Sequence, residues 1–316
     1  MGTFINNLGR EILNTFKVYT NASMWGKILI LTLLFILVIV LFKPNRVYEG
    51  FKQNDEFVNK VGGDVYDDFY AEIYDHLVYN NLKDEYEIGE IVNKAPLTSE
   101  SIILDVGSGT GHHVASLKSK GFDVIGIDIS SAMIKKAKEN YPENNYKQGD
   151  ALNAMEFQAN QFTHIMCMYF TIYYMKDKRA FFENCMKWLM PGGTLVVHLV
   201  DRDRFDPILP PGNPLMSVSP QKYADKRITS TKVKFNDFSY SADFKLNEDT
   251  NVAKFEEKFK SDDDGKVRKN EHIMYMEPLD QIVQMAQQTG FILKAQVDLV
   301  HCQYEYQYLY MFTKPN

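Results

Sequence analysis

The segment Ile103–His113, which reads ILDVGSGTGHH, constrains the fold more than any other part of the chain. Apolar residues lead into Asp105, and glycines then recur at every second position from Gly107 to Gly111. This pattern is typical of a buried parallel strand that passes through a tight turn into a helix. Glycine permits positive φ and lets a ligand lie against the backbone, while free N–H groups at the helix start provide a positive electrostatic end. The segment predicts an α/β fold with a ligand site at the turn.

The spacing of the glycines distinguishes between two kinds of nucleotide-binding turn. The dinucleotide fingerprint G-x-G-x-x-G would need its third glycine at His112, which disfavours an NAD-dependent dehydrogenase. The pattern that is present, D-x-G-x-G-x-G, resembles the first motif of the Rossmann-like S-adenosylmethionine-dependent methyltransferases.

Three later motifs extend this resemblance. FDVIGIDI predicts a strand that ends near Asp128, where a carboxylate can accept hydrogen bonds from both hydroxyls of a ribose. Ser130 is expected to cap the next helix, whose first turn holds Met133. YKQGDAL over residues 146–152 resembles the family's adenine-binding motif, and WLMPGGTLVV over residues 188–197 resembles the turn before its fifth strand.

A helix predicted from residue 64 carries the pattern Y-D-x-F-x-x-x-Y-D, which resembles the amino-terminal helix that closes over the cofactor in small-molecule methyltransferases. A stripe of core-packing aromatic residues is the alternative interpretation of its tyrosines. Together the motifs imply S-adenosylmethionine as cofactor and the following binding residues: Tyr66, Tyr74, Asp105, Gly107, Ser108, Gly109, Thr110, Gly111, Asp128, Ile129, Met133, Asp150, Ala151 and Met168.

Two residues are candidates for catalysis. His198 is predicted near the carboxyl end of a strand over residues 194–200, and the ordinary pKa of histidine suits a general base. A hydrogen-bonded histidine in the core is the alternative. Tyr174 belongs to an apolar, hydroxyl-bearing lip over residues 168–174, where the amino-adenine branch of the family has N-P-P-Y. The lip resembles that of sugar-amine and other small-molecule methyltransferases.

Composition excludes some partners. The formal net charge of −6 argues against a broad nucleic-acid surface. The three cysteines form neither a metal-ligand spacing nor a disulfide framework, and Cys167 and Cys185 are expected in the core. We therefore expect no metal and no nucleic-acid partner.

The amino-terminal region has a different character. Residues 1–23 predict an amphipathic leader, residues 24–43 a single transmembrane helix, and residues 44–63 a polar linker. Its apolar run, Ile28–Phe42, contains one polar residue, Thr32, and no small-residue cleavage site follows it, which disfavours a cleaved signal peptide. Basic residues after the run and unpaired cysteines favour a catalytic domain on the cytosolic face of the membrane.

Residues 64–316 are expected to form the methyltransferase domain, with a cap inserted over residues 203–276. The insertion begins with a proline-rich stretch and continues as three segments of alternating apolar and polar residues, 232–245, 253–261 and 267–276. The expected fold is a seven-stranded, mostly parallel, doubly wound α/β sheet with helices on both faces, a small antiparallel cap and one amino-terminal transmembrane helix.

The function that these features imply is methyl transfer by a membrane-anchored enzyme to a small-molecule or lipid-linked acceptor. The apolar lip and the apolar residues Ile208, Leu209, Leu215 and Met216 suit an amphiphilic acceptor. The alternative is a catalytically silent, membrane-tethered scaffold that binds the cofactor, because no acceptor-side residue is diagnostic of turnover.

Overall fold

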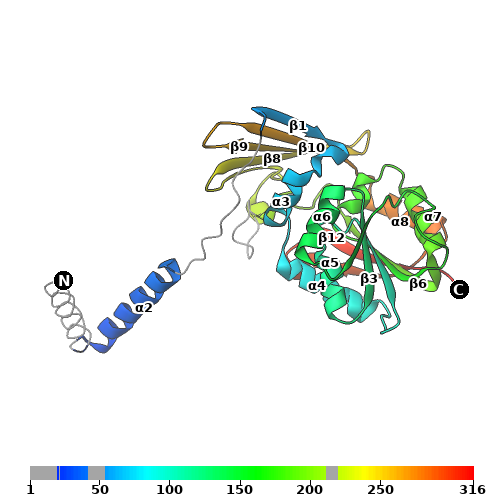
Figure 1. Ribbon diagram of the computed structural model, residues 1–316, viewed down its shortest axis with the longest axis horizontal. Coiled ribbons are helices and arrows are strands. Elements are labelled where there is room, and N and C mark those ends of the chain that lie inside the picture. The colour runs from blue at the N-terminus through cyan, green and yellow to red at the C-terminus, as the bar shows by residue number, and fades with distance from the viewer. Residues whose placement is uncertain (1–19, 21, 42–53, 211–219) are drawn as a thin grey trace. The chain divides into compact units, whose positions relative to one another are not determined.

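The computed structural model describes residues 20, 22–41, 54–210 and 220–316 (Figure 1). The chain divides into two compact units, residues 1–50 and 51–316. The leader predicted for residues 1–23 lies almost entirely outside the described residues, as do Leu215 and Met216.

In the first unit, helix α2 spans Met24–Leu41, where the sequence predicts a helix. The hydroxyl of Thr32 donates to the carbonyl of Ile28 at 2.9 Å and is thereby satisfied within the helix. Among the described residues, which include most of the range 24–43 predicted as an anchor, no helix is long and apolar enough to cross a bilayer.

The second unit contains a seven-stranded sheet with the order β11-β12-β6-β5-β2-β3-β4. Strands β6, β5, β2, β3 and β4 run parallel to one another. β12 runs antiparallel to both β6 and β11. The seven-stranded, mostly parallel sheet that the sequence predicts is therefore confirmed. Its strands are β2 (Ile102–Val106), β3 (Asp123–Asp128), β4 (Asn145–Gln148), β5 (Phe162–Cys167), β6 (Leu189–Val200), β11 (Ile292–Asp298) and β12 (Gln307–Thr313).

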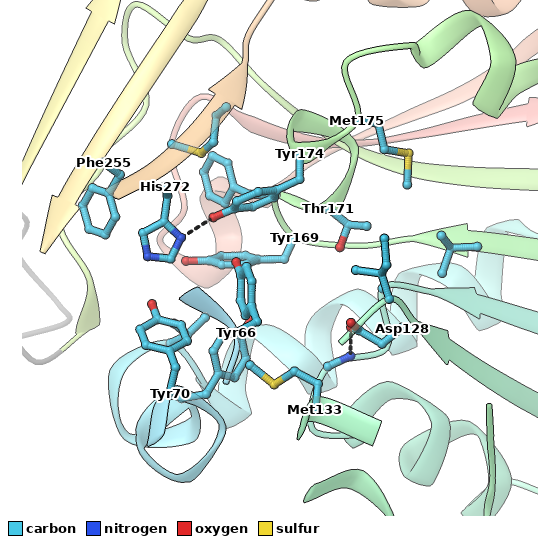
Figure 2. Close-up of a pocket in the computed structure, with 18 of the residues that line it drawn as sticks. Tyr66, Tyr70, Asp128, Met133, Tyr169, Thr171, Tyr174, Met175, Phe255 and His272 are labelled. Carbon is cyan, nitrogen blue, oxygen red and sulfur yellow. Dashed lines mark hydrogen bonds between the residues drawn. The ribbon is translucent and has the colours of Figure 1, made fainter. Parts of the chain in front are cut away.

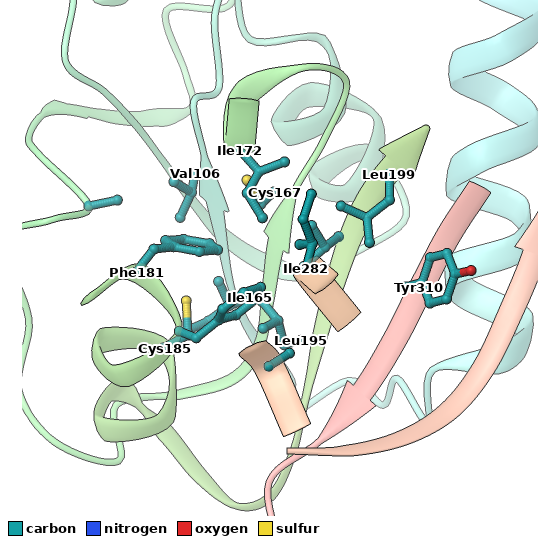
Figure 3. Close-up of a cluster of buried hydrophobic side chains, with 14 of the residues drawn as sticks. Val106, Ile165, Cys167, Ile172, Phe181, Cys185, Leu195, Leu199, Ile282 and Tyr310 are labelled. Carbon is teal, nitrogen blue, oxygen red and sulfur yellow. The ribbon is translucent and has the colours of Figure 1, made fainter. Parts of the chain in front are cut away.

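Helices cover both faces of this sheet. Successive side chains of its buried strands therefore enter two different cores, one on each face. Leu104 and Val106 of β2 enter a core shared with α7 and α8, part of which is shown in Figure 3. Ile103 enters the core shared with α4, α5 and α6. The helices are α3 (Asp68–Leu77), α4 (Asn81–Lys94), α5 (His112–Ser119), α6 (Ser131–Asn140), α7 (Lys178–Trp188) and α8 (Leu279–Gln288).

Ser130 fixes the amino end of α6 and a neighbouring segment at the same time. Its hydroxyl oxygen accepts a hydrogen bond from the N–H of Met133 at 3.1 Å, which is the predicted helix cap. The same hydroxyl donates to the carbonyl of Tyr66 at 2.6 Å. The end of β3 is thereby tied to the residues that precede α3.

A second sheet forms the cap and has the strand order β1-β10-β9-β8-β7. Residues 232–245, predicted as one strand, are divided between β7 and β8 by a turn in which the N–H of Phe235 donates to the carbonyl of Phe238. β1 lies in the range predicted as a linker, because its short FVNKV sequence pairs as an edge strand with β10. The strands are β1 (Phe57–Val61), β7 (Ser230–Lys234), β8 (Phe238–Asn247), β9 (Val252–Ser261) and β10 (Val267–Tyr275).

Arg268 connects the cap to α3. Its side chain is 4% exposed, and its guanidinium donates to both carboxylate oxygens of Asp67 at 2.9 and 3.0 Å. Asp67 also accepts a hydrogen bond from the N–H of Tyr70 at 3.1 Å and so caps α3. One ion pair therefore holds both β10 and the start of α3.

We expect Arg268→Ala to lower the free energy of unfolding by about 1.5–3 kcal/mol, because it removes two charge-assisted hydrogen bonds and leaves Asp67 paired with Lys60, at 3.4 Å. Urea unfolding followed by circular dichroism measures the change. Lys269→Ala, which removes an exposed cation from the next position of β10, should cost less than about 0.5 kcal/mol. Equal losses for the two variants would contradict a structural role for the ion pair.

Candidate active site

A cavity of about 270 Å³ lies at the carboxyl ends of β2 and β3, where open α/β sheets bind their ligands (Figure 2). The turns that follow β4 and β5 continue this side of the cavity. The remaining walls come from α3, from residues 205–210 and from the cap strands β8, β9 and β10. The cavity is therefore lined by both sheets.

The glycine turn after β2 borders this cavity. Its three glycines have positive φ angles of 70°, 53° and 94°. The N–H groups of Gly107 and Ser108 both donate to the carbonyl of Ile127, at 2.8 and 2.9 Å. A Cβ atom on Gly107 would overlap the side chain of Thr171. Both the backbone conformation and the close approach therefore require glycine at position 107.

Asp128, at the end of β3, is oriented by two backbone groups. One carboxylate oxygen accepts from the N–H of Gly109 at 3.0 Å, and the other accepts from the N–H of Ser130 at 2.9 Å. Burial raises the pKa of Asp128, and these two hydrogen bonds oppose the rise. A carboxylate offers roughly four acceptor positions, so Asp128 can accept further hydrogen bonds from ligand hydroxyls.

Most of the residues predicted from the sequence line this cavity. They are Tyr66, Tyr74, Gly107, Gly109, Asp128, Ile129, Met133, Asp150, Ala151 and Tyr174. Ser108, Thr110 and Met168 line a smaller cavity, which shares Gly107 and Gly109 with the larger one. Asp105 and Gly111 line neither cavity, because Asp105 belongs to buried β2 and Gly111 precedes α5.

The smaller cavity, of about 90 Å³, is bordered by charged side chains of α4 and α5. The Nζ atom of Lys83 lies 2.5 Å from Oε1 of Glu87, and Nε2 of His113 lies 3.4 Å from both Asp84 and Glu87. Burial opposes ionisation, but Lys83 nevertheless lowers the pKa of Glu87 to about 2. Against the same effect of burial, Glu87 and Asp84 raise the pKa of His113 to about 9.

Sequence reasoning missed Lys83, Asp84 and Glu87. The available signal was the spacing of Lys83 and Glu87, four residues apart on a helix, and such pairs are also common on exposed helix surfaces. Across the described ranges of the chain, no group of three or more His, Cys, Asp or Glu side chains is arranged to hold a metal ion.

Two buried polar atoms beside the glycine turn have no hydrogen-bond partner among the residues that the structure describes. They are Oδ2 of Asp105 and Oγ of Ser108. Burial raises the pKa of Asp105 to about 7. Buried polar atoms are nearly always paired, and Ser108 lines the smaller cavity, so its hydroxyl suits a site whose ligand supplies polar groups. The turn, Asp128 and this hydroxyl together fit a ligand with ribose hydroxyls and an amino-acid end.

The other end of the larger cavity is aromatic (Figure 2). The ring centroids of Tyr66 and Tyr174 lie 5.6 Å apart, and those of Tyr70 and His272 lie 5.4 Å apart. The hydroxyl of Tyr174 lies 2.9 Å from Nδ1 of His272, which belongs to cap strand β10. The sequence indicated Tyr174 but not His272, because alternation along β10 does not reveal which sheet its inner face packs against.

The structure corrects the assignment of His198 as a general base. Its side chain is fully buried and lines neither cavity. Nδ1 lies 2.5 Å from the carbonyl of Tyr169, and Nε2 lies 3.0 Å from Oε1 of Gln307. Burial lowers the pKa of His198 to about 4. His198 is therefore the hydrogen-bonded core histidine of the alternative interpretation, and it positions the backbone at Tyr169.

We expect Gly107→Ala to lower the free energy of unfolding by at least about 1–2 kcal/mol, because the new Cβ meets Thr171 at a positive φ. Thermal and urea unfolding measure the change. Gly63→Ala provides the matched control, because a Cβ atom there meets nothing within 4 Å. A Gly107→Ala protein as stable as the Gly63→Ala protein would show that the turn tolerates a side chain.

Known proteins resemble this chain in sequence. Residues 103–193 match the family model described as a methyltransferase domain. The dTDP-4-amino-2,3,4,6-tetradeoxy-D-glucose N,N-dimethyltransferase of Saccharopolyspora spinosa is 32% identical over 140 residues, which are 42% of this chain and 55% of that protein. The phosphoethanolamine N-methyltransferase of Plasmodium falciparum is 33% identical over 113 residues, which are 34% of this chain and 42% of that protein. The chain thus spans about half the length of these curated relatives.

A solved structure shows the same fold. The CcbJ methyltransferase from Streptomyces caelestis aligns with a TM-score of 0.61 and 16% identity, over 83% of this chain and 100% of that chain. The family model covers the glycine turn, Asp128 and Asp150, so the family and the cofactor predicted from the sequence are confirmed. The matched domain and the fold are those of the class I, Rossmann-like S-adenosylmethionine-dependent methyltransferases that the sequence resembles.

Proposed function

We propose that this chain transfers a methyl group from S-adenosylmethionine to a small-molecule acceptor. One observation carries the proposal. A single cavity is bordered at one end by the glycine turn and Asp128, and at the other by aromatic side chains of α3, of the loop after β5 and of the cap. A donor and an acceptor bound in it would face one another, and positioning of this kind supplies much of the catalysis of a displacement reaction.

S-adenosylmethionine, when bound, supplies a methyl group on a positively charged sulfur. In our proposal Asp128 accepts hydrogen bonds from the ribose hydroxyls, and Asp150 and Ala151 border the adenine. The amino-acid end occupies the smaller cavity, where His113 carries a charge suited to a carboxylate group. Asp128, Asp150 and Ala151 line the larger cavity and His113 lines the smaller one, whereas Asp105 lies behind the glycine turn.

The acceptor is proposed to occupy the aromatic end. Its walls are mostly apolar and aromatic, and such walls strengthen electrostatic interactions once a ligand has displaced water. The names of the two curated relatives describe an amino sugar and phosphoethanolamine as their acceptors, and both compounds carry an amine. Aromatic faces attract cationic groups, so an amine suits the tyrosines of this chamber.

The proposal has two further features, an acceptor with an apolar part and a membrane location. Ile208 and Leu209 line the cavity, which supports an acceptor with an apolar part, including a lipid-linked one. A membrane location with the domain on the cytosolic side rests on the sequence of residues 24–43 alone. Resistance of the full chain to alkaline carbonate extraction from membranes would support that location, and full extraction would oppose it.

We expect Asp128→Ala to weaken binding of S-adenosylhomocysteine, the demethylated product, by roughly 10- to 100-fold, or about 1.5–3 kcal/mol. The cause is the loss of two charge-assisted hydrogen bonds to the ribose. Isothermal titration calorimetry on the full chain measures the affinity. Asp123→Ala, at the exposed start of the same strand, should leave it unchanged. Tighter binding of NAD than of S-adenosylhomocysteine would refute the cofactor assignment.

Turnover is tested by incubating the full chain with S-adenosylmethionine labelled in its methyl group and a panel of primary amines, phenols and a membrane lipid extract. We expect label to enter at least one amine or phenol. Incorporation into the lipid extract alone would favour a lipid-linked acceptor. Binding of S-adenosylhomocysteine without transfer to any member of the panel would favour the silent scaffold.

A further inference from the structure

We propose that Tyr174, His272 and Glu257 form a proton relay through which the acceptor loses a proton as it is methylated. The inference rests on the proposed function and adds the base that the sequence did not reveal. The hydroxyl of Tyr174 lies 2.9 Å from Nδ1 of His272, and Nε2 of His272 lies 2.8 Å from Oε2 of Glu257. Tyr174 and His272 line the cavity, and Glu257 lies behind them.

The register of the cap sheet explains how the relay is assembled. β9 and β10 pair antiparallel, with His272 opposite Phe255 and Asn270 opposite Glu257. His272 and Glu257 are therefore diagonal neighbours on the same face of the sheet, close enough for long side chains to meet. Both side chains are 2% exposed or less. Tyr174 reaches them from the 3-10 turn η2, Thr171–Tyr174, which follows β5.

The hydrogen-bond partners of Glu257 determine the direction in which protons can move. Oε1 of Glu257 accepts from the hydroxyl of Tyr240 at 2.7 Å, and Oε2 accepts from the amide of Asn270 at 3.4 Å. An ionised carboxylate can only accept, so the proton of neutral His272 resides on Nε2 and Nδ1 keeps its lone pair. Tyr174 must then donate its own proton to Nδ1. The Tyr174 oxygen also has a hydrogen bond with Tyr66, and its remaining lone pair faces an acceptor bound in the cavity.

Several ionisable groups surround His272, and its phenol neighbours stay protonated. The ionisable and charged groups around His272 are Glu257, Tyr240 and Arg268 of the cap, Tyr174 of η2, and Tyr66 and Tyr70 of the amino-terminal segment. Arg268 is already paired with Asp67. Burial raises the pKa of Tyr66, Tyr70 and Tyr174 well above the ordinary value, so none of these phenols ionises on its own.

The proposed step balances as follows. A lone pair of the acceptor nitrogen or oxygen forms the new bond to the methyl carbon, and the electrons of the broken carbon–sulfur bond stay on sulfur. The acceptor's N–H or O–H proton moves to the oxygen of Tyr174, while the original proton of Tyr174 moves to Nδ1 of His272. The resulting imidazolium is stabilised by Glu257 and returns its proton to water when the product leaves. In this scheme Tyr174 is the catalytic residue, and His272 and Glu257 position and accept the proton.

The first test needs no acceptor. The full chain, labelled with ¹⁵N-histidine and saturated with S-adenosylhomocysteine, is examined by long-range ¹H–¹⁵N correlation spectra, with the His272→Gln spectrum as assignment. We expect neutral His272 to carry its proton on Nε2. A proton on Nδ1 in the neutral form would overturn the relay, because Tyr174 could then no longer donate to that nitrogen.

The second test uses the amine or phenol that the wild-type protein methylates. His272→Gln and Tyr174→Phe should each lower kcat by about 10²- to 10³-fold, with unchanged affinity for S-adenosylhomocysteine. The pH profile of kcat should rise through the pKa that NMR gives for His272, and His272→Gln should lose that inflection. His164→Gln and Tyr310→Phe, equivalent changes at buried positions outside the cavity, should keep wild-type kcat.

The outcomes separate the relay from the proposed function. If the wild-type protein methylates no panel member, the proposed function fails, and the tautomer of His272 still decides the direction of the relay. If the protein is active and the His272→Gln variant retains wild-type kcat and its pH inflection, the relay is refuted. A kcat that falls together with melting temperature and cofactor affinity would show that His272 only stabilises the cap.

Discussion

The hydrogen bond from the N–H of Gly109 to Asp128 is the contact on which the cofactor side of the structure depends. The turn after β2 that presents this N–H has positive φ at its glycines, and Gly107 in it lies against Thr171. The N–H groups of the same turn hold the carbonyl of Ile127, so the ends of two parallel strands are fixed to one another. Asp128 is consequently held in one orientation before any ligand arrives, which lowers the entropy cost of binding.

The sequence was sufficient for the features that arise from local pattern. Buried parallel strands require apolar side chains on both faces, and the turn requires glycine, so both leave a mark that one sequence reveals. The cap was predicted less completely. The range 232–245 conceals a turn, and β1 becomes a strand only through its pairing with distant β10. Pairing between segments so far apart in sequence leaves no local signal.

The two histidines show the same limit at the level of single side chains. His198 stands near the end of a strand, as a ligand-binding residue should, but alternation along β6 points it to the same side as Val196, which belongs to the core with α4 to α6. His272 lies in a strand that no motif marks, and its place in the cavity follows from how the cap packs against η2. Position along a strand can be predicted, whereas the face that meets the cavity depends on tertiary packing.

The two ends of the cavity are consequently built in different ways. Residues 103–193, which match the methyltransferase model, contain the glycine turn, Asp128, Asp150 and Tyr174. Tyr66, Tyr70 and His272 lie outside that range and are brought together by long-range contacts, among them Arg268 with Asp67 and Ser130 with Tyr66. Changes in the cap can therefore alter the acceptor end while the hydrogen bonds of the cofactor end remain intact. A fold arranged in this way can retain one methyl donor and take on different acceptors, because the two requirements fall on separate parts of the chain.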